Sequence, residues 1–354
     1  MRVLQIVHGR EAGGIKTLAE VIGGGLEARR VSVETAVLFP GRGLAAKLSG
    51  MARVAWRVLT GRYDAILAYQ PTASILTGIA GFIARCPRRI VHQTALPGET
   101  RPAMRVLDRI TGTLGLYTAN IVNTRATQAV FANYPARYRA ALRLIEHGVA
   151  ALKPQRSRAA TLAAFGIPDA RILLNVGRLA DQKNQGVLVR ALACLPAARL
   201  VIAGDGPEHA DYTALATTLG VADRLHLLGD VSRQDIADLL AAADVFVFPS
   251  VWETFGLAAV EAALAGLPVI AADLPVLREV LTADGTSVAA FVAPRDVEGW
   301  VTAITAPRTP ARAAVETIAR RYAVTRMIDA YAVLLGQTGA ERAGALAPRG
   351  MGVA

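Results

Sequence analysis

The chain has 354 residues, of which 53% are hydrophobic and 19% charged. This length exceeds what one hydrophobic core usually supports, and this composition excludes extensive disorder, so we expect two globular domains. The 39 Lys and Arg residues outnumber the 28 Asp and Glu residues, and the resulting formal net charge of +11 favours an anionic partner.

Short apolar runs alternate with helical segments along the whole chain. In the first half, the expected strands cover residues 3–7, 33–38, 64–69, 89–93, 120–123 and 142–146. In the second half, they cover residues 172–176, 199–203, 224–228, 244–248, 268–271 and 289–292. Continuous apolar strands separated by helices predict parallel sheets covered on both faces. We therefore expect an α/β protein with two Rossmann-like, doubly wound parallel-sheet domains that face each other across a cleft.

A polar, proline-containing stretch after residue 150 marks the expected domain boundary. We expect an N-terminal domain over residues 1–150 and a C-terminal domain over 151–310. A last helix over 311–336 is expected to pack back toward the N-terminal domain, and residues 337–354 have the Gly, Ala and Pro content of a mobile tail. The first residues form a strand-like run without the features of a signal peptide, which predicts a cytoplasmic protein.

Most of the positive charge lies in the first half of the chain. Residues 1–150 contain 20 basic and 8 acidic residues, a net charge of +12, which leaves 19 basic and 20 acidic residues for the rest. An acidic membrane face or a nucleic acid would suit this charge. Aromatic residues make up only 5% of the chain, so the stacking platforms of a nucleic-acid-binding protein are not expected.

The helix expected over residues 44–59 is the candidate for membrane contact. Its basic residues Lys47, Arg53 and Arg57 gather within roughly a third of the helical circumference, beside apolar residues that include Trp56. Such a helix suits peripheral contact with the anionic inner face of the cell membrane. The alternative is an ordinary helix that lines the cleft and has one solvated side.

Four strands of the second half are followed by loops with unusual residues, at the edge where open parallel sheets bind ligands. The loop residues that we expect to approach a ligand are Gly177, Gly206, Gly229 and Val231. Arg178 and Lys183 lie in the first of these loops and can supply positive charge to a diphosphate. The alternative for these two is a pair of ordinary surface residues.

The helix expected over residues 255–265 contains one polar side chain, Glu261. Burying an unpaired carboxylate costs several kcal/mol, so this side chain needs a partner. The two hydroxyls of a ribose would satisfy it, and a structural hydrogen bond or ion pair is the alternative. The N-terminus of the same helix is a natural position for a phosphate. Its residues are Thr254, Phe255, Gly256 and Leu257.

These residues also resemble a known family. The run from Glu253 to Leu257, followed by Glu261, is similar to the two-glutamate signature of the family 4 retaining glycosyltransferases, which have the GT-B fold. Four further blocks follow that family's order and spacing: Gly177-Arg178-Leu179 with Lys183, Ala203-Gly204-Asp205-Gly206-Pro207, Ala243-Asp244-Val245-Phe246-Val247-Phe248-Pro249-Ser250 and Gly266-Leu267-Pro268-Val269-Ile270. The resemblance implies that Arg178 and Lys183 hold the donor diphosphate and Glu261 the donor ribose. It also implies that Glu253 orients the transferred sugar and that residues 229–231 lie near the base.

The first half resembles the family more loosely. The run Glu11-Ala12-Gly13-Gly14-Ile15-Lys16 looks like the family's first glycine loop, where the backbone of Gly13 and Gly14 would face the donor. Many relatives place a histidine near the transferred sugar after the fourth strand. His92 is the catalytic candidate for that role, although Ala95 is the alternative equivalent position. His147 is interpreted as structural or close to a hinge.

The sequence contains no Asp-x-Asp motif, and its two cysteines match no metal-ligand spacing. We therefore expect transfer without a metal or cofactor from a UDP- or GDP-sugar donor, with the retention that the resemblance implies. The expected acceptor is a sugar or a lipid-linked molecule in envelope polysaccharide or glycolipid synthesis. We expect the N-terminal domain to bind this acceptor and the C-terminal domain to bind the nucleotide sugar. A sugar-nucleotide epimerase or hydrolase on the same fold and a non-catalytic nucleotide-sugar-binding protein are the alternatives.

Overall fold

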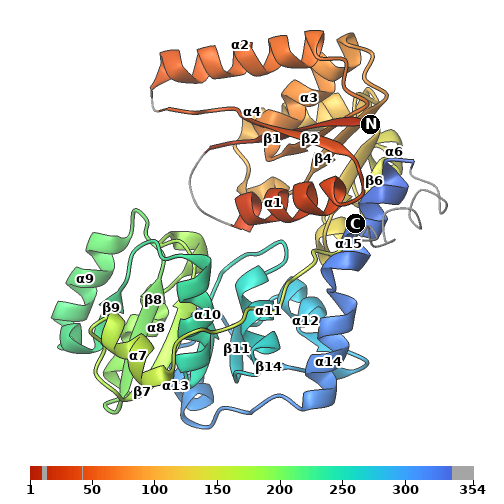
Figure 1. Ribbon diagram of the computed structural model, residues 1–354. Helices are drawn as coiled ribbons and strands as arrows, with labels where there is room; N and C mark the ends of the chain where they lie inside the picture. Colours follow the sequence, from red (N-terminus) through yellow and green to blue (C-terminus); the bar gives the residue numbers. More distant parts are fainter. Residues whose placement is uncertain (10–13, 42, 337–354) are drawn as a thin grey trace, which may run out of the picture. The chain divides into compact units, whose positions relative to one another are not determined.

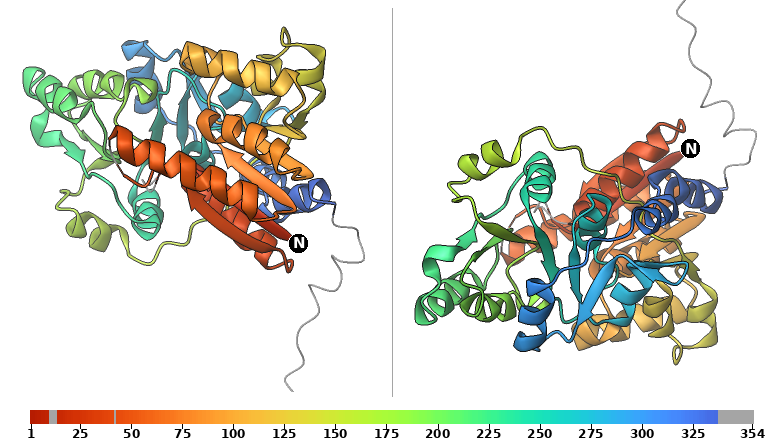
Figure 2. Two further views of the ribbon diagram at one scale, coloured as in Figure 1. Left: turned by 90° about the horizontal axis from the view of Figure 1, so that it is seen from above. Right: turned by 90° about the horizontal axis from the view of Figure 1, so that it is seen from below.

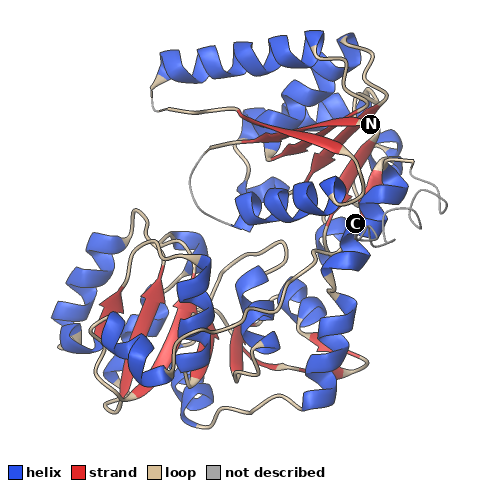
Figure 3. Ribbon diagram, in the orientation of Figure 1, coloured by secondary structure: helices blue, strands red, loops and turns tan. Residues whose placement is uncertain are grey.

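The computed structural model describes residues 1–9, 14–41 and 43–336. The chain forms two compact units, of which the first contains Met1–Gly148 and the described residues from Val324 onward, and the second contains Val149–Ala323. In each unit, helices cover a six-stranded parallel sheet, as Figures 1 and 3 show. The two sheets confirm the expected α/β class.

The sheet of the first unit has the strand order β2-β1-β3-β4-β5-β6. Its strands are β1 (Arg2–Val7), β2 (Ser32–Val37), β3 (Ala65–Tyr69), β4 (Arg88–His92), β5 (Ala119–Val122) and β6 (Leu142–Leu144). Its helices are α1 (Gly14–Glu27), α2 (Leu44–Thr60), α3 (Pro71–Ile83), the short η1 (Pro97–Glu99), α4 (Pro102–Thr113), α5 (Arg125–Ala129), α6 (Ala136–Ala140) and α15 (Val324–Leu334). The strand order changes direction between β1 and β3.

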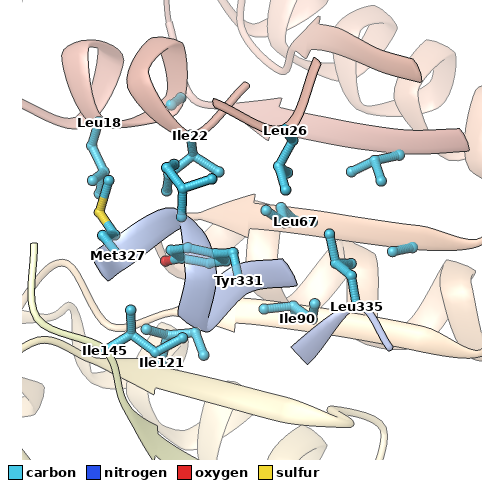
Figure 4. Packing of buried hydrophobic residues seen from close by; sticks show 14 of the residues in the cluster. Leu18, Ile22, Leu26, Leu67, Ile90, Ile121, Ile145, Met327, Tyr331 and Leu335 are labelled. Atoms are coloured by element: carbon cyan, nitrogen blue, oxygen red, sulfur yellow. The ribbon is translucent and has the colours of Figure 1, made fainter. Parts of the chain in front are cut away.

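Strand β1 shows why the strands of this sheet are apolar throughout. Val3 and Val7 pack into a core cluster with α1 and α15, whereas Leu4 and Ile6 pack into a second cluster with α2. Successive side chains of a strand point to opposite faces, so both faces must be apolar. Figure 4 shows the first cluster, in which Tyr331 of α15 lies among residues of α1 and of the strands.

The sheet of the second unit has the strand order β14-β11-β10-β7-β8-β9, which changes direction between β7 and β10. Its strands are β7 (Arg171–Val176), β8 (Ala198–Ala203), β9 (Leu225–Leu227), β10 (Val245–Phe248), β11 (Val269–Ala272) and β14 (Ala289–Val292). Its helices are α7 (Arg158–Ala164), η2 (Asp181–Lys183), α8 (Gly186–Ala193), α9 (His209–Thr218), η3 (Ala222–Arg224), α10 (Arg233–Ala242), α11 (Leu257–Leu264), α12 (Pro275–Val280), α13 (Val297–Thr305) and α14 (Arg312–Arg321).

The structure differs from the sequence-based expectation in three elements. A small antiparallel hairpin, β12 (Thr282–Ala283) with β13 (Thr286–Ser287), was not expected. The single helix expected over 311–336 is two helices, α14 and α15, because the chain leaves the helical conformation at Tyr322, whose carbonyl accepts a 2.8 Å hydrogen bond from the Val149 N–H. Helix α11 begins at Leu257 rather than at residue 255, since Gly256 takes a left-handed conformation with φ of 89°.

Candidate functional site

The carboxyl ends of β7 and β10 are neighbours at the point where the strand order of the second sheet changes direction. Ligands of open α/β sheets bind at this position, because the loops on either side of it diverge. The loop after β7 contains Gly177, Arg178 and Lys183, and the loop after β10 contains Glu253. The fold therefore brings these sequence-predicted residues to one edge of one sheet.

Lys183 and Glu253 form a close ion pair at this edge. The Lys183 Nζ lies 2.5 Å from the Glu253 Oε1, and the Ser250 hydroxyl donates to the same oxygen at 2.8 Å. The Glu253 side chain is 8% exposed and that of Lys183 19%, so both charges are shielded from water. The second carboxylate oxygen, Oε2, has no hydrogen-bond partner among the described residues and can accept a hydrogen bond from a ligand hydroxyl.

Hydrogen bonds made by the residues on either side of Lys183 fix its position. Asn184, which follows it, has a φ of 52° and donates from its side chain to the carbonyls of Pro249 at 3.1 Å and Pro294 at 2.7 Å. The Val251 N–H donates to the Gln182 carbonyl at 2.9 Å. The loops after β7 and β10 are thus held together, which keeps the ammonium group of Lys183 beside the Glu253 carboxylate.

The loops after β7, β8 and β9 are also joined through glycines. A Cβ on Gly206 would lie 2.1 Å from the Leu179 carbonyl oxygen, so only glycine fits this approach between two backbones. Gly204 donates to the Gly229 carbonyl at 2.8 Å, and Gly229 has a φ of 68°. The close approach of the two backbones explains why residue 206 is a glycine. Contact of Gly206 with a ligand stays a prediction, as does ligand contact by Gly177, Gly229 and Val231.

Arg178 is exposed at the start of the first loop and has no ion-pair partner among the described residues. At the start of α11, the Phe255 ring is buried and packs edge-on against Tyr322 with centroids 5.1 Å apart. Gly256 supplies the left-handed residue from which the helix begins at Leu257. Phosphate binding by Arg178 and by the run Thr254–Leu257 stays a prediction.

Glu261 is buried in α11 and pairs with a residue that the sequence analysis did not select. The Arg233 guanidinium lies 2.7 Å from the Glu261 Oε1, and the side chains are 44% and 8% exposed, respectively. Burial raises the pKa of Glu261, and the charge and hydrogen bond of Arg233 oppose that rise. The ion pair left open as an alternative is therefore present, and ribose binding by Glu261 stays a prediction. Arg233 is the first residue of α10, just after the loop that contains Gly229 and Val231, and this position was the only signal for it.

The predicted residues of the first unit lie at the edge of the other sheet. Gly13 falls outside the described residues, and Gly14 is the first residue of α1, which follows β1. His92 ends β4 and is buried, with Nδ1 2.8 Å from the Ala68 carbonyl oxygen and Nε2 2.7 Å from the Tyr331 hydroxyl. Burial lowers the pKa of His92 to about 4. This geometry favours a structural role, and catalysis by His92 stays a prediction.

His147 is also buried, with Nε2 2.9 Å from the amide nitrogen of Asn123, and burial lowers its pKa to about 3.

Gln70 is a second residue that the sequence analysis missed. It follows β3, beside the point where the first sheet changes direction, and has a φ of 78° and a ψ of 152°. This backbone conformation is strained for any residue with a side chain, and such strain is often found at functional sites. The side-chain oxygen of Gln70 is buried without a hydrogen-bond partner among the described residues.

The second unit is similar in sequence to known proteins. Residues 158–306 match the family model of glycosyl transferases group 1. D-inositol 3-phosphate glycosyltransferase of Mycolicibacterium smegmatis is 41% identical over 155 residues, which cover 42% of this chain and 35% of that protein. The enzyme of the same name from Mycobacterium tuberculosis is 38% identical over 154 residues, which cover 42% and 32%. The matched region spans about a third of the length of each relative.

Solved structures are similar over nearly the whole chain. Anabaena Alr3699/HepE, crystallised with UDP and glucose, superposes with a TM-score of 0.80 at 23% identity, covering 96% of this chain and 100% of that one. WaaG, described as a glycosyltransferase of lipopolysaccharide biosynthesis, superposes with a TM-score of 0.65 at 18% identity, covering 97% and 98%. These likenesses show that the chain has the fold of those proteins.

Proposed function

We propose that this protein transfers a sugar from a nucleoside-diphosphate donor to an acceptor, because residues 158–306 match the model of glycosyl transferases group 1 and nearly the whole chain has the GT-B fold. The observation that carries the proposal is the Lys183–Glu253 ion pair at the carboxyl ends of β7 and β10, with Arg178 at the start of the same loop. The second unit binds the donor there.

The chemistry needs the anomeric carbon to lose a diphosphate, so the growing negative charge on that leaving group must be stabilised. Lys183 and Arg178 supply two positive charges beside it, with the N-terminus of α11 as a further source of positive potential. Glu253 holds Lys183 in place through Oε1, which leaves Oε2 to accept a hydrogen bond from a hydroxyl of the transferred sugar. Because these groups do the work of a divalent ion, we propose transfer without a metal, with the retention that the family resemblance implies.

The donor is a UDP-sugar in this proposal, with a GDP-sugar as the alternative. Structures of Anabaena Alr3699/HepE contain UDP and UDP-glucose, which supports a uridine nucleotide for a chain of the same fold. Glu261 binds the donor ribose, since a buried carboxylate with one partner retains capacity for hydroxyl donors. The acceptor is a sugar or a lipid-linked molecule bound by the first unit, in polysaccharide or glycolipid synthesis at the inner face of the cell membrane.

The test is a thermal-shift titration of the full chain with UDP, GDP and ADP and their glucose derivatives, each with and without EDTA. We expect UDP and UDP-glucose to raise the melting temperature equally in both conditions, because a ligand that binds only the folded state stabilises it. Release of UDP from UDP-glucose with membrane extract as the source of acceptor then measures turnover. A shift that EDTA abolishes would contradict metal independence. Binding without turnover would favour a non-catalytic protein, and turnover to free sugar or an isomer would favour a hydrolase or epimerase.

A further inference from the structure

The first unit exposes large apolar side chains on three neighbouring helices, α2, α3 and α4. These helices lie side by side on one face of the first sheet, as Figure 2 shows from above. Among the described residues, 14 large hydrophobic side chains are exposed, and 10 of them belong to these three helices. None lies in the second unit, Val149–Ala323. We refer to the exposed side of α2, α3 and α4 as the three-helix surface.

Helix α2 is apolar on two sides. Gly50, Val54 and Val58 face the core, as expected for a helix on a sheet. A second stripe points outward, and it consists of Leu44, Leu48, Trp56 and Leu59, which are 74%, 57%, 69% and 43% exposed. Spacings of three, four and eight residues place these four on one side of the helix. A helix whose outer side faces only water would carry polar residues there.

Helices α3 and α4 repeat this pattern. Ile79, Phe82 and Ile83 are exposed on α3 with spacings of three and four residues. On α4, Val106, Leu107 and Ile110 are exposed, and Leu114, which caps the helix, continues their side. Exposed apolar residues scattered singly are normal, but a gathering of this kind marks a surface that contacts another apolar phase or protein.

The charges around the three-helix surface are positive. Lys47 and Arg53 are exposed on α2 and have no ion-pair partner among the described residues. Arg57 differs from the sequence-based expectation, because its guanidinium is held by Glu34, which lies 2.5 Å away, and by the Tyr63 hydroxyl. Helix α4 adds Arg105 and Arg109.

The three helices contain one acidic residue, Asp108 of α4, and it does not reduce the surface charge. Its carboxylate is buried and accepts hydrogen bonds from the hydroxyls of Tyr117 at 3.0 Å and Tyr138 at 2.6 Å. Water-exposed positive charge beside exposed apolar side chains is complementary to the interface of an anionic bilayer, where apolar residues enter the acyl boundary and basic residues meet the headgroups.

We propose that the three-helix surface docks the first unit onto a membrane rich in anionic lipids, in the plane of the bilayer. The structure thereby assigns the membrane contact to three helices rather than to α2 alone. A second copy of this chain is a poorer occupant, because two such surfaces would bring like charges together. No helix among the described residues has the length and hydropathy to cross a bilayer. The proposal concerns the partner of the first unit and stands whether or not the second unit transfers a sugar.

The test is co-sedimentation of the full chain with vesicles of phosphatidylcholine alone or of equal parts phosphatidylcholine and phosphatidylglycerol. We expect binding to the anionic vesicles at low salt that weakens at high salt. The variant Leu48→Glu/Phe82→Glu/Ile110→Glu changes one exposed residue in each helix and should reduce the partition coefficient about tenfold or more. Val333→Glu is the matched control, since Val333 is 60% exposed on α15, outside the three-helix surface, and its variant should bind as the unchanged chain does.

Each outcome of this test decides for or against the proposal. Unaltered binding by the triple variant, or equal loss in the Val333→Glu control, would overturn it, as would absence of binding by the unchanged chain. A dimer in sedimentation equilibrium that the triple variant dissociates would assign the surface to a second copy instead. If the triple variant does not fold, Lys47→Glu/Arg53→Glu keeps the test open, because it should remove the preference for anionic vesicles. The thermal shift with UDP reports on the second unit and separates failure of docking from failure of the donor site.

Discussion

Both units are six-stranded parallel sheets covered by helices, yet their unusual residues lie in different places. In the second unit, they lie in the loops at the carboxyl ends of the strands, where Lys183 pairs with Glu253, and none of the exposed large hydrophobic side chains of the described chain belongs to this unit. In the first unit, the outer sides of α2, α3 and α4 carry most of those side chains. Two units with the same architecture can thus carry their candidate sites in different places, in the loops of one unit and on the helix surfaces of the other.

Removing positive charge from the loops of the second unit should reduce activity the most. Lys183→Ala deprives the leaving diphosphate of a cation and leaves the buried Glu253 carboxylate without its ion-pair partner. We expect kcat for sugar transfer to fall by about 100-fold to 1,000-fold. Arg190→Ala is the control, since Arg190 is an exposed cation in the last turn of α8 and has no ion-pair partner among the described residues. A Lys183→Ala variant with unchanged kcat would refute the proposed role.

A second change tests whether the first unit contributes chemistry or only a scaffold. The pKa of His92 is about 4 in the folded state, below its ordinary value near 6.5, so the unfolded chain binds the proton more tightly. The stability that His92 provides is present above pH 6.5 and declines as pH falls toward 4, by about 3 kcal/mol in total. Buried His147, whose pKa is about 3, acts in the same direction, so His92→Gln should reduce rather than remove the fall in the melting temperature of the full chain over this pH range. If His92 is structural, the transfer activity of His92→Gln should fall only as far as its folded fraction falls. A loss of kcat in the fully folded variant would instead make His92 catalytic.

A third change probes the strain at Gln70. Its φ of 78° suits glycine far better than any other residue, so Gln70→Gly should stabilise the first unit by about 1–3 kcal/mol, measured by urea denaturation. If the strain serves to present the side-chain amide to a ligand, the same variant should also raise KM for the donor or acceptor. A variant that is no more stable than the unchanged chain would show that the surrounding structure already relieves the strain.

Loss of the Arg233–Glu261 pair should weaken donor binding only slightly. Arg233 is 44% exposed, so we expect Arg233→Gln to weaken donor binding only about fivefold, measured by calorimetric titration with UDP. The pKa of Glu261 is already raised by burial, and removing Arg233 should raise it further. The Glu261 carboxylate then takes up a proton at a higher pH. In a plot of donor affinity against pH, the loss of affinity on the acidic side should therefore begin at a higher pH. Arg190→Gln, on the exposed side of α8, should leave both properties unchanged.

Much of the fold follows from the sequence, because apolar runs bounded by loops mark buried parallel strands. All twelve strands of the two large sheets lie at their expected positions. The hairpin of β12 and β13 was missed because two-residue strands have no pattern of their own. The break between α14 and α15 was missed because it depends on a hydrogen bond from Val149, which is 173 residues away along the chain.

The sequence predicts those residues of the candidate site that directly follow an apolar strand. Lys183 could be selected because it follows an apolar strand, and Glu253 because its run resembles the family signature. Their contact is a consequence of strand order. Arg233 could not be selected, since its pairing with Glu261 depends on how α10 and α11 pack. The three-helix surface was only partly visible, because the sequence of α3 does not reveal which of its apolar residues face the sheet and which face outward.

The division of the chain has a consequence for its synthesis. The first unit needs α15, whose Tyr331 covers the ring of His92, and α15 emerges only after the 175 residues of Val149–Ala323 have been translated. At about 5–20 residues per second, a ribosome takes roughly 10–35 s to make them. The nascent first unit therefore waits with one face of its sheet covered by α1 but not by α15, while the uninterrupted second unit can complete its core. We expect this interval to be the period when a chaperone is most needed.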